Sequence, residues 1–237
     1  MTTFQITPLK RKLIFALVLL SSFQMINAQT NITVFGSVGR SDIQVSGIGV
    51  LDIVDPFIKP ITQYTAGIQY ERELNPNFSF VTGGQYTTRG FGIRENFNID
   101  LFGVDLPLGA RIETRLQYLE VPAMLKYKIG EGGVTPYVKA GASAAYAIDG
   151  KIQPKVDAII TWKLPAININ LESDMYNRLD VSGIVGAGLE LPIGETGAVQ
   201  FDVTYRHSLN DMFLDKITDI RIKSHGLSAG LGYTMRF

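Results

Sequence analysis

The chain has 237 residues, of which 46% are apolar and 19% charged, a composition that supplies a folded domain and excludes a disordered protein. Its 22 basic and 22 acidic side chains balance, so no excess of positive charge suggests binding to nucleic acid. The absence of cysteine excludes disulfides, thiolate metal sites, cysteine nucleophiles and an acylated lipoprotein N-terminus.

The N-terminal end has the features of a secretory signal peptide. A basic cluster at 10–12 precedes an apolar run at 13–20, and a more polar stretch then ends at Ala28. A membrane anchor is the alternative, but the run would rise only about 12 Å as a helix, whereas a bilayer core is roughly 30 Å thick. We therefore predict a signal peptide over 1–28, cleaved after Ala28, and an exported domain over 29–237 with a net charge of −3, since 19 basic residues then remain beside 22 acidic ones.

The exported part repeats one pattern, in which apolar and polar side chains alternate along segments of nine to eleven residues. Such alternation is typical of a β-strand with one apolar face, and about ten residues cross a bilayer at a tilt of about 45°. The last segment is the clearest, because Leu227, Leu231 and Phe237 share one parity while Ser228 and Arg236 share the other. In chain order the predicted strands are 31–39, 63–71, 77–87, 119–127, 138–146, 182–191, 198–206 and 227–237, of which the first and third are weakest and have no assigned outward face.

Short and long connections alternate between these strands. Tight turns rich in Gly, Asn and Pro are expected at 73–77, 130–133 and 194–197, and long loops at 40–62, 88–112, 148–179 and 207–225. Short turns at one rim and long loops at the other are the layout of outer-membrane barrels. The sequence thus predicts an all-β fold, an eight-stranded antiparallel up-and-down transmembrane β-barrel with short periplasmic turns and long extracellular loops.

Charged side chains also fall on the polar parity of the predicted strands. An eight-stranded barrel has an interior that side chains can just fill, and a buried charge requires a partner. We therefore predict a polar network inside the barrel, with an ion or substrate path as the alternative. Its members are Glu71, Glu120, Lys126, Lys139, Glu190, Asp202, Arg206 and Arg236, four acidic and four basic.

Two motifs resemble the PorT-like family of outer-membrane β-barrels. Residues 118–127 read Tyr-Leu-Glu-Val-Pro-Ala-Met-Leu-Lys-Tyr, similar to that family's Y-L-E-I-P-x-x-L-K-Y segment, and 135–141 are similar to the P-Y-x-x-x-G strand that follows it. The resemblance implies a barrel in the outer membrane of Gram-negative bacteria of the Bacteroidota type. Some members of the family are linked to protein secretion and gliding, and it has no catalytic motif to carry over.

The C-terminal end resembles the recognition signal of outer-membrane barrels, through Tyr233, Met235 and the terminal Phe237. The resemblance implies that the barrel-assembly machinery is a partner. Outer-membrane lipid is the other expected partner, and the long loops could bind further envelope proteins.

No motif points to a catalytic, cofactor-binding or metal site. His207 and His225 flank three aspartates of the fourth long loop, so a surface metal site is the alternative to an ordinary acidic loop. Ser208 and Ser224 each adjoin a histidine, but neighbouring residues in a strand point to opposite faces. We therefore expect neither an enzyme nor a cofactor.

Three functional hypotheses follow. The first is a small non-enzymatic barrel that acts through its extracellular loops in partner binding, secretion or envelope structure. The second is a narrow channel or transporter for small solutes, for which eight strands leave little room. The third is a soluble periplasmic β-sandwich, which would not need an apolar outward face on every strand.

Overall fold

The computed structural model describes residues 29–46, 57–101, 104–130, 132–157, 161–169, 171, 177–212 and 221–237. The signal peptide predicted at 1–28, with its cleavage point at Ala28, lies outside these residues. No helix in the described part of the chain is long and apolar enough to cross a membrane. The strands there are β1 (Thr30–Ser46), β2 (Ile58–Glu73), β3 (Phe78–Leu101), β4 (Val104–Lys128), β5 (Thr135–Asp157), β6 (Thr161–Lys163), β7 (Ile167–Asn168), β8 (Leu179–Ile193), β9 (Gly197–Ser208) and β10 (Arg221–Arg236).

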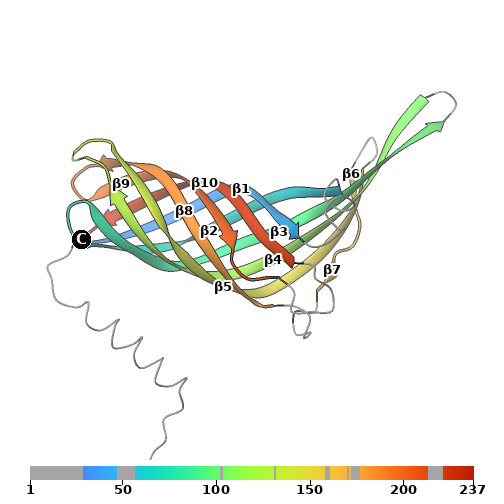
Figure 1. Ribbon diagram of the computed structural model, residues 1–237. Coiled ribbons are helices and arrows are strands. Elements are labelled where there is room, and N and C mark those ends of the chain that lie inside the picture. Colours follow the sequence, from blue (N-terminus) through green and yellow to red (C-terminus); the bar gives the residue numbers. More distant parts are fainter. Residues whose placement is uncertain are drawn as a thin grey trace, which may run out of the picture.

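Eight of these strands close into an antiparallel barrel, which confirms the predicted fold class (Figure 1). Their order around the wall is β4-β3-β2-β1-β10-β9-β8-β5, and pairing between β4 and β5 completes the circle. The short strands β6 and β7 pair only with β5, beyond the wall. Because the sheet closes on itself, the sandwich hypothesis is wrong.

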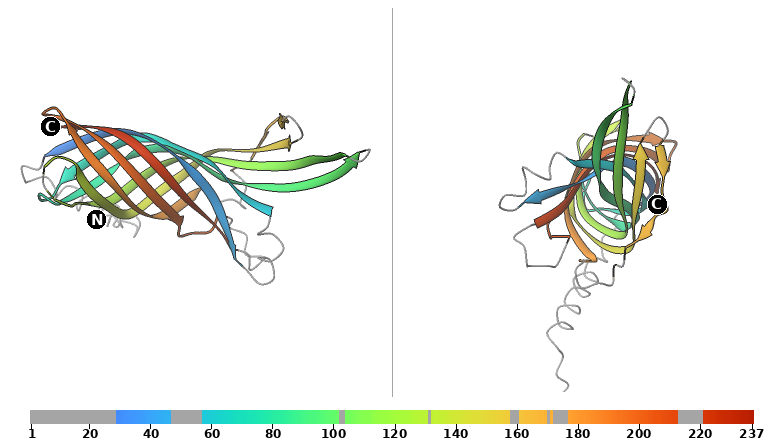
Figure 2. Two further views of the ribbon diagram at one scale, coloured as in Figure 1. Left: turned by 90° about the horizontal axis from the view of Figure 1, so that it is seen from above. Right: turned by 90° about the vertical axis from the view of Figure 1, so that its right-hand side faces the viewer.

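The first and last strands meet at the rim that carries the short turns. Thr30 and Phe237 exchange backbone hydrogen bonds, with N···O distances of 3.4 and 2.9 Å. The turns that join β2 to β3, β4 to β5 and β8 to β9 lie at the same end, and Gly194 in the last of them has a φ of +66°, which favours glycine. The strand ends that the longer connections join, such as Ser46 of β1 and Arg221 of β10, lie at the opposite end (Figure 2).

The strands continue further at this opposite end than the alternation predicted. The loop expected at 88–112 is wrong, because β3 and β4 pair there as a hairpin from Arg89↔Leu116 up to Leu101↔Val104. This hairpin projects beyond the other strands (Figures 1 and 2). The predicted loops also began too early at 40 and 148, since β1 runs to Ser46 and β5 to Asp157. The segment 96–101 also alternates in sequence, since Phe97, Ile99 and Leu101 stand between Asn96, Asn98 and Asp100, so the strand pattern continues beyond the predicted end.

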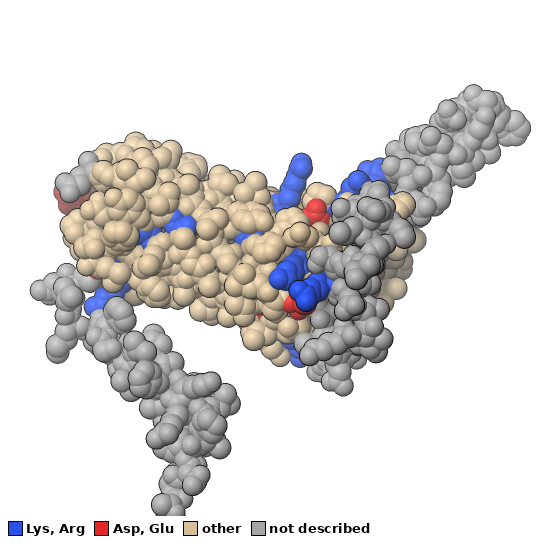
Figure 3. All heavy atoms as spheres, viewed as in Figure 1, with Lys and Arg blue, Asp and Glu red and all other residues tan. Residues whose placement is uncertain are grey.

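The structure assigns the faces of the two strands that the sequence left open. On β1 the odd-numbered residues, such as Asn31 and Thr33, are buried, while Val34 and Val38 are about half exposed. On β3 the odd-numbered residues from Ser79 to Arg89 likewise face inward, while Phe78, Phe80 and Tyr86 face outward. The outward faces of all eight strands carry exposed apolar side chains, which form a belt around the wall. Charged side chains are sparse in this belt and gather toward the end with the long connections (Figure 3).

An apolar cluster fills the interior at the end of the barrel with the long connections. We call it the apolar cap. It draws residues from β1, β2, β4, β5 and the long connections, so it spans the barrel from wall to wall. Its buried members are Ile43, Val45, Ile58, Leu116, Tyr118, Ala145, Ala147, Leu171 and Met212.

Candidate functional site

The eight charged residues predicted for the interior all occupy inward positions of the barrel strands. Six are buried, Asp202 is partly buried, and Arg236 lies at the rim of the short turns with 34% of its side chain exposed. The structure divides these eight residues between two groups of ion pairs along the barrel axis. We call the groups the Lys126 cluster and the Arg89 cluster.

The Lys126 cluster lies toward the rim of the short turns. The Lys126 Nζ is 2.9 Å from Glu71 Oε2 and 2.8 Å from Glu190 Oε2, so one ammonium joins three strands. Glu190 also accepts a hydrogen bond of 2.6 Å from Arg236 Nη2. Lys128 extends the cluster toward the rim of the short turns, since its Nζ lies 3.4 Å from Glu71 Oε1.

A further contact between strands extends the cluster toward the middle of the barrel. Lys139 Nζ lies 2.7 Å from Asp202 Oδ2, and the Tyr137 hydroxyl donates to the same oxygen at 3.2 Å. The Tyr137 ring also lies beneath Lys126, whose Nζ is 4.3 Å from the ring centroid. The ring therefore links the two lysines, and cation–π attraction adds to the charge pairing.

The Arg89 cluster lies between the Lys126 cluster and the apolar cap. The Arg89 guanidinium forms a salt bridge with Glu120 through Nη2 and another of 2.9 Å with Asp180 through Nη1. Arg206 Nε approaches the same Glu120 at 3.6 Å. Ser208 Oγ donates to Asp180 Oδ2 at 2.6 Å, so hydrogen bonds and opposite charges compensate the buried carboxylate.

Each cluster is neutral on a formal count of its described members. Two arginines oppose Glu120 and Asp180 in the Arg89 cluster. In the Lys126 cluster four cations oppose four carboxylates, namely Lys126, Lys128, Lys139 and Arg236 opposite Glu71, Glu73, Glu190 and Asp202. A neutral arrangement avoids the large cost of burying an uncompensated charge.

Little space remains between the two clusters. A cavity of about 40 Å³ lies there, with lining residues from all eight barrel strands, including Phe35, Met124 and Arg206. A single water molecule occupies about 30 Å³ in the liquid, so the cavity has room for about one.

Sequence reasoning missed two central members of the Arg89 cluster. Arg89 lies two residues beyond the predicted end of the third strand, on the same parity as the inward Thr87. Asp180 lies two residues before the predicted start of the sixth strand, on the parity of Ser182. Extending each alternation by one inward position would have found both.

The hydroxyl and imidazole groups considered for catalysis lie on opposite faces of the wall. Ser208 and Ser224 are buried inside the barrel, whereas His207 and His225 face outward with their ring centroids 6.4 Å apart. Neither serine is therefore placed against its neighbouring histidine. Among the described residues no group of three or more His, Asp or Glu could hold a metal ion, and two of the aspartates considered for one, Asp215 and Asp219, lie outside them.

The residues of the proposed C-terminal signal face outward at the rim of the short turns. Tyr233 and Met235 belong to the apolar belt, and the Phe237 side chain is 72% exposed. Tyr233 lies directly opposite Val34 of β1, so the signal residues adjoin the seam where the barrel closes.

Outside the membrane belt, one acidic side chain joins the projecting hairpin to β5. Glu113 accepts contacts from Lys155 Nζ at 2.6 Å and from Arg115 Nη2 at 3.2 Å. Desolvation by burial raises the pKa of Glu113, but the hydrogen bonds and positive charges of Lys155 and Arg115 outweigh it and hold the pKa below its ordinary value.

Comparison with known proteins places the architecture among outer-membrane barrels. Residues 25–214 match the model of a family described as an outer membrane protein beta-barrel domain, which spans β1 to β9. No curated protein matches the chain. Similar solved structures include OprG from Pseudomonas aeruginosa (11% identity, 89% of this chain and 96% of that chain covered, TM-score 0.45), Neisserial surface protein A (12%, 87% and 97%, TM-score 0.41) and the N-terminal β-barrel domain of Pseudomonas aeruginosa OprF (14%, 88% and 97%, TM-score 0.40).

Proposed function

The chain belongs to the family of outer membrane protein β-barrel domains, and from this premise we propose that it is a sealed, non-enzymatic barrel that presents its long connections to a protein partner. Its location is the outer membrane. The family match does not give the role of the barrel there, so the sealed, partner-binding role is our proposal. Two features support it, a filled interior and a projecting hairpin.

The filled interior carries the proposal. From one rim to the other the lumen contains the Lys126 cluster, a cavity of about 40 Å³, the Arg89 cluster and the apolar cap. A hydrated ion or a solute would have to break paired charges that lie out of contact with water, at a cost of several kcal/mol. Activity is therefore expected on the outer surface of the protein rather than inside it.

The placement of the two serine–histidine pairs among the described residues is consistent with the proposed non-enzymatic role. Catalysis by a serine and a histidine requires both groups within hydrogen-bond reach. In this barrel Ser208 donates instead to Asp180, and His207 lies on the opposite face of β9.

The β3–β4 hairpin is the surface best suited to a partner. Pairing between β2 and β3 ends at Ile58↔Ile93, and within the described residues the 95–101 part of β3 has no neighbouring strand on that side. Unpaired backbone groups at a sheet edge can accept a strand from another chain. We therefore expect recognition by β-strand addition at this edge.

Conductance measurements test the seal. Wild-type protein in a planar bilayer is expected to give no steady single-channel currents, because both clusters block the lumen. The double variant Arg89→Ala/Lys126→Ala removes the central cation of each cluster and should conduct, provided that it remains folded by heat-modifiability on a gel. Steady currents through the wild type would instead support the narrow channel or transporter for small solutes.

Truncation of the hairpin tests the partner-binding role. Residues 95–110 can be replaced by Asn-Gly, a pair suited to a two-residue turn, because Arg94 and Arg111 lie opposite each other. The barrel should still fold, and proteins cross-linked to the wild type in outer-membrane fractions should no longer be recovered. The matched control replaces 47–56, the connection between β1 and β2, by a Gly-Ser segment of the same length. Recovery of the same partners from the hairpin variant would contradict the proposal.

Export and assembly complete the proposal. We propose that residues 1–28 are removed after Ala28 and that Tyr233, Met235 and Phe237 are recognised by the barrel-assembly machinery. The motifs at 118–127 and 135–141 further suggest a PorT-like barrel of a Gram-negative bacterium, with a role in secretion or envelope structure.

A further inference from the structure

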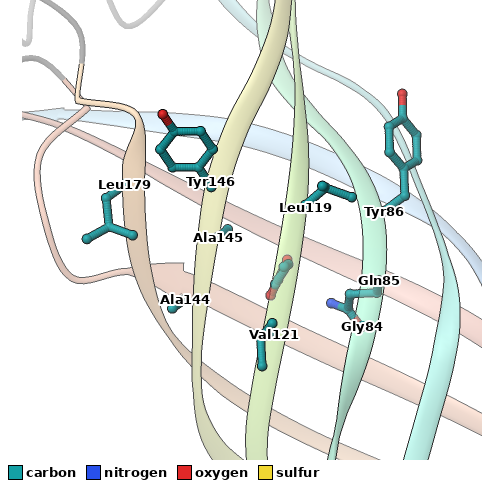
Figure 4. Close-up of a pocket in the computed structure, with 10 residues that line it drawn as sticks. Gly84, Gln85, Tyr86, Leu119, Val121, Ala144, Ala145, Tyr146 and Leu179 are labelled. Carbon is teal, nitrogen blue, oxygen red and sulfur yellow. The ribbon is translucent and has the colours of Figure 1, made fainter. Parts of the chain in front are cut away.

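The outer wall carries an apolar groove of about 580 Å³ on its membrane-facing side. It lies across β3, β4, β5 and the start of β8, and Figure 4 shows the rings of Tyr86 and Tyr146 on either side of Leu119. These three side chains and Leu179 lie in one row, because Tyr86↔Leu119, Leu119↔Tyr146 and Tyr146↔Leu179 are directly opposed. All four are between 38% and 56% exposed, so they line an open surface.

Small residues below the two tyrosines create the depression. On β3 the next outward position below Tyr86 is Gly84, and on β5 the next below Tyr146 is Ala144. Val121 lies between them, directly opposite Ala144. The surface over Gly84 and Ala144 is therefore depressed relative to the row of large side chains. The rings of Tyr86 and Tyr146 bound this depression at one end.

Neither the backbone nor a neighbour requires glycine at position 84. A Cβ atom added to Gly84 would meet nothing within 4 Å, and its φ is not in the left-handed region. By contrast, a Cβ on Gly67 of the neighbouring strand would lie 2.5 Å from a backbone oxygen. A larger apolar side chain would fit at Gly84 and face hydrocarbon. The groove is therefore open because the residue there is glycine, and no steric clash excludes a larger one.

A fixed cation lies at the upper end of the groove. The Arg178 guanidinium carbon is 4.7 Å from the centre of the Tyr146 ring, and Nε and Nη2 both donate to the Ala147 carbonyl at 3.3 Å. Arg178 forms no salt bridge with a carboxylate among the described residues. Tyrosine rings of an outer-membrane barrel lie at the level of the lipid headgroups, so Arg178 is at the depth of their phosphates.

We propose that this groove is a binding site for a phosphate-bearing, acylated lipid of the outer leaflet. One acyl chain lies over Gly84 and Ala144 between the two tyrosines, and the phosphate pairs with Arg178. Planar guanidinium donors suit phosphate oxygens, and the apolar lining suits the chain. The site depends on the outer-membrane location and is independent of the sealed interior.

Lipid binding by the full exported chain in detergent micelles tests the proposal, with lipid A and dephosphorylated lipid A as the probes and native mass spectrometry as the readout. Gly84→Leu fills the groove from β3, and Ala144→Leu fills it from β5. Each should lower the affinity for lipid A about tenfold, the loss expected when a chain segment loses its apolar contact. The matched control is Gly36→Leu, an outward position on β1 where a Cβ would make only an ordinary contact of 3.9 Å.

A second substitution separates the phosphate from the acyl chain. Arg178→Gln should lower the affinity for lipid A about tenfold and leave dephosphorylated lipid A unchanged, since a charge-assisted hydrogen bond is lost. The groove is refuted if Gly84→Leu and Ala144→Leu bind lipid A as well as Gly36→Leu does. Equal affinity of wild type and Arg178→Gln for lipid A would refute the phosphate contact. Heat-modifiability confirms that each variant is folded before its affinity is compared.

Discussion

Lys126 and Glu190 lie on strands that are not neighbours, yet the Lys126 Nζ is 2.8 Å from Glu190 Oε2 across the barrel interior. The same ammonium contacts Glu71 on β2, so one side chain joins three parts of the wall. A lumen wide enough for bulk water would keep these groups apart. The two contacts together show how closely β2 and β8, which lie opposite each other in the strand order, approach through Lys126 in the lower half of the barrel.

Replacing Lys126 should destabilise the barrel strongly. Lys126→Met leaves Glu71 and Glu190 buried with fewer partners, and the loss of one member of a buried ion pair costs about 3–5 kcal/mol. Reversible urea unfolding in lipid vesicles measures the change. Lys59→Met is the control, because Lys59 is exposed and should change the free energy of unfolding by less than about 0.5 kcal/mol. Equal stability of the two variants would contradict the prediction.

The two arginines of the Arg89 cluster should differ in importance. Arg89 contacts both Glu120 and Asp180, whereas Arg206 reaches only Glu120, at 3.6 Å. Arg89→Met is therefore expected to lower the free energy of unfolding by about 3–5 kcal/mol, and Arg206→Met by less. Unfolding of both variants in the same vesicles gives the order, and a larger loss for Arg206→Met would show that the cluster is organised differently.

An inward glycine should be far less tolerant than an outward one. A Cβ on Gly188 would lie 2.4 Å from the Phe201 carbonyl oxygen and 2.6 Å from the Tyr137 ring, so Gly188→Leu displaces the ring that supports Lys126. We expect poor folding or a loss of more than about 3 kcal/mol. Gly84→Leu, which faces open space, serves as the control. Both are compared by the fraction of heat-modifiable protein on a gel.

The contact between Glu113 and Lys155 should depend on pH. The pKa of Glu113 is lower in the folded protein than its ordinary value of 4.5, so its stabilising effect is complete above that value and is lost as the pH falls through the folded pKa. Amide-exchange protection of Glu113 and its partner Gln153 should therefore decrease as the pH falls below 4.5 and passes through the folded pKa. The Glu113→Gln variant should show weaker protection above that pH and no comparable step.

The sequence predicts the membrane-crossing part of the fold well, because lipid imposes a pattern. Every second residue of a wall strand meets hydrocarbon, so 227–237 alternates strictly, and the structure has β10 through these residues to Arg236, although it begins six residues earlier, at Arg221. Above the membrane this requirement ends. Residues 96–101 nevertheless alternate, as Asn-Phe-Asn-Ile-Asp-Leu, and they pair with β4 as a continuous strand, so the sequence contains a signal for this extension that the predicted loop left out.

The interior is predictable in part. Parity places Lys126, Glu190 and Glu71 inside, as the structure does, but it does not say which of them meet. Contacts across the lumen depend on how the closed sheet is staggered, and no local pattern encodes that stagger. Arg89 was missed for a simpler reason, since the predicted strand ended at Thr87.

The seam between β1 and β10 has a consequence for biogenesis. Thr33 and Thr234 share a hydrogen bond of 2.7 Å, although 201 positions separate them in the chain. No partial polypeptide can form this bond, so a nascent barrel has two open edges until its last residues arrive. Contacts this distant also slow folding, because the entropy of closing a long loop must be overcome first. The polypeptide therefore keeps two unpaired strand edges until β1 and β10 meet, and such edges promote aggregation.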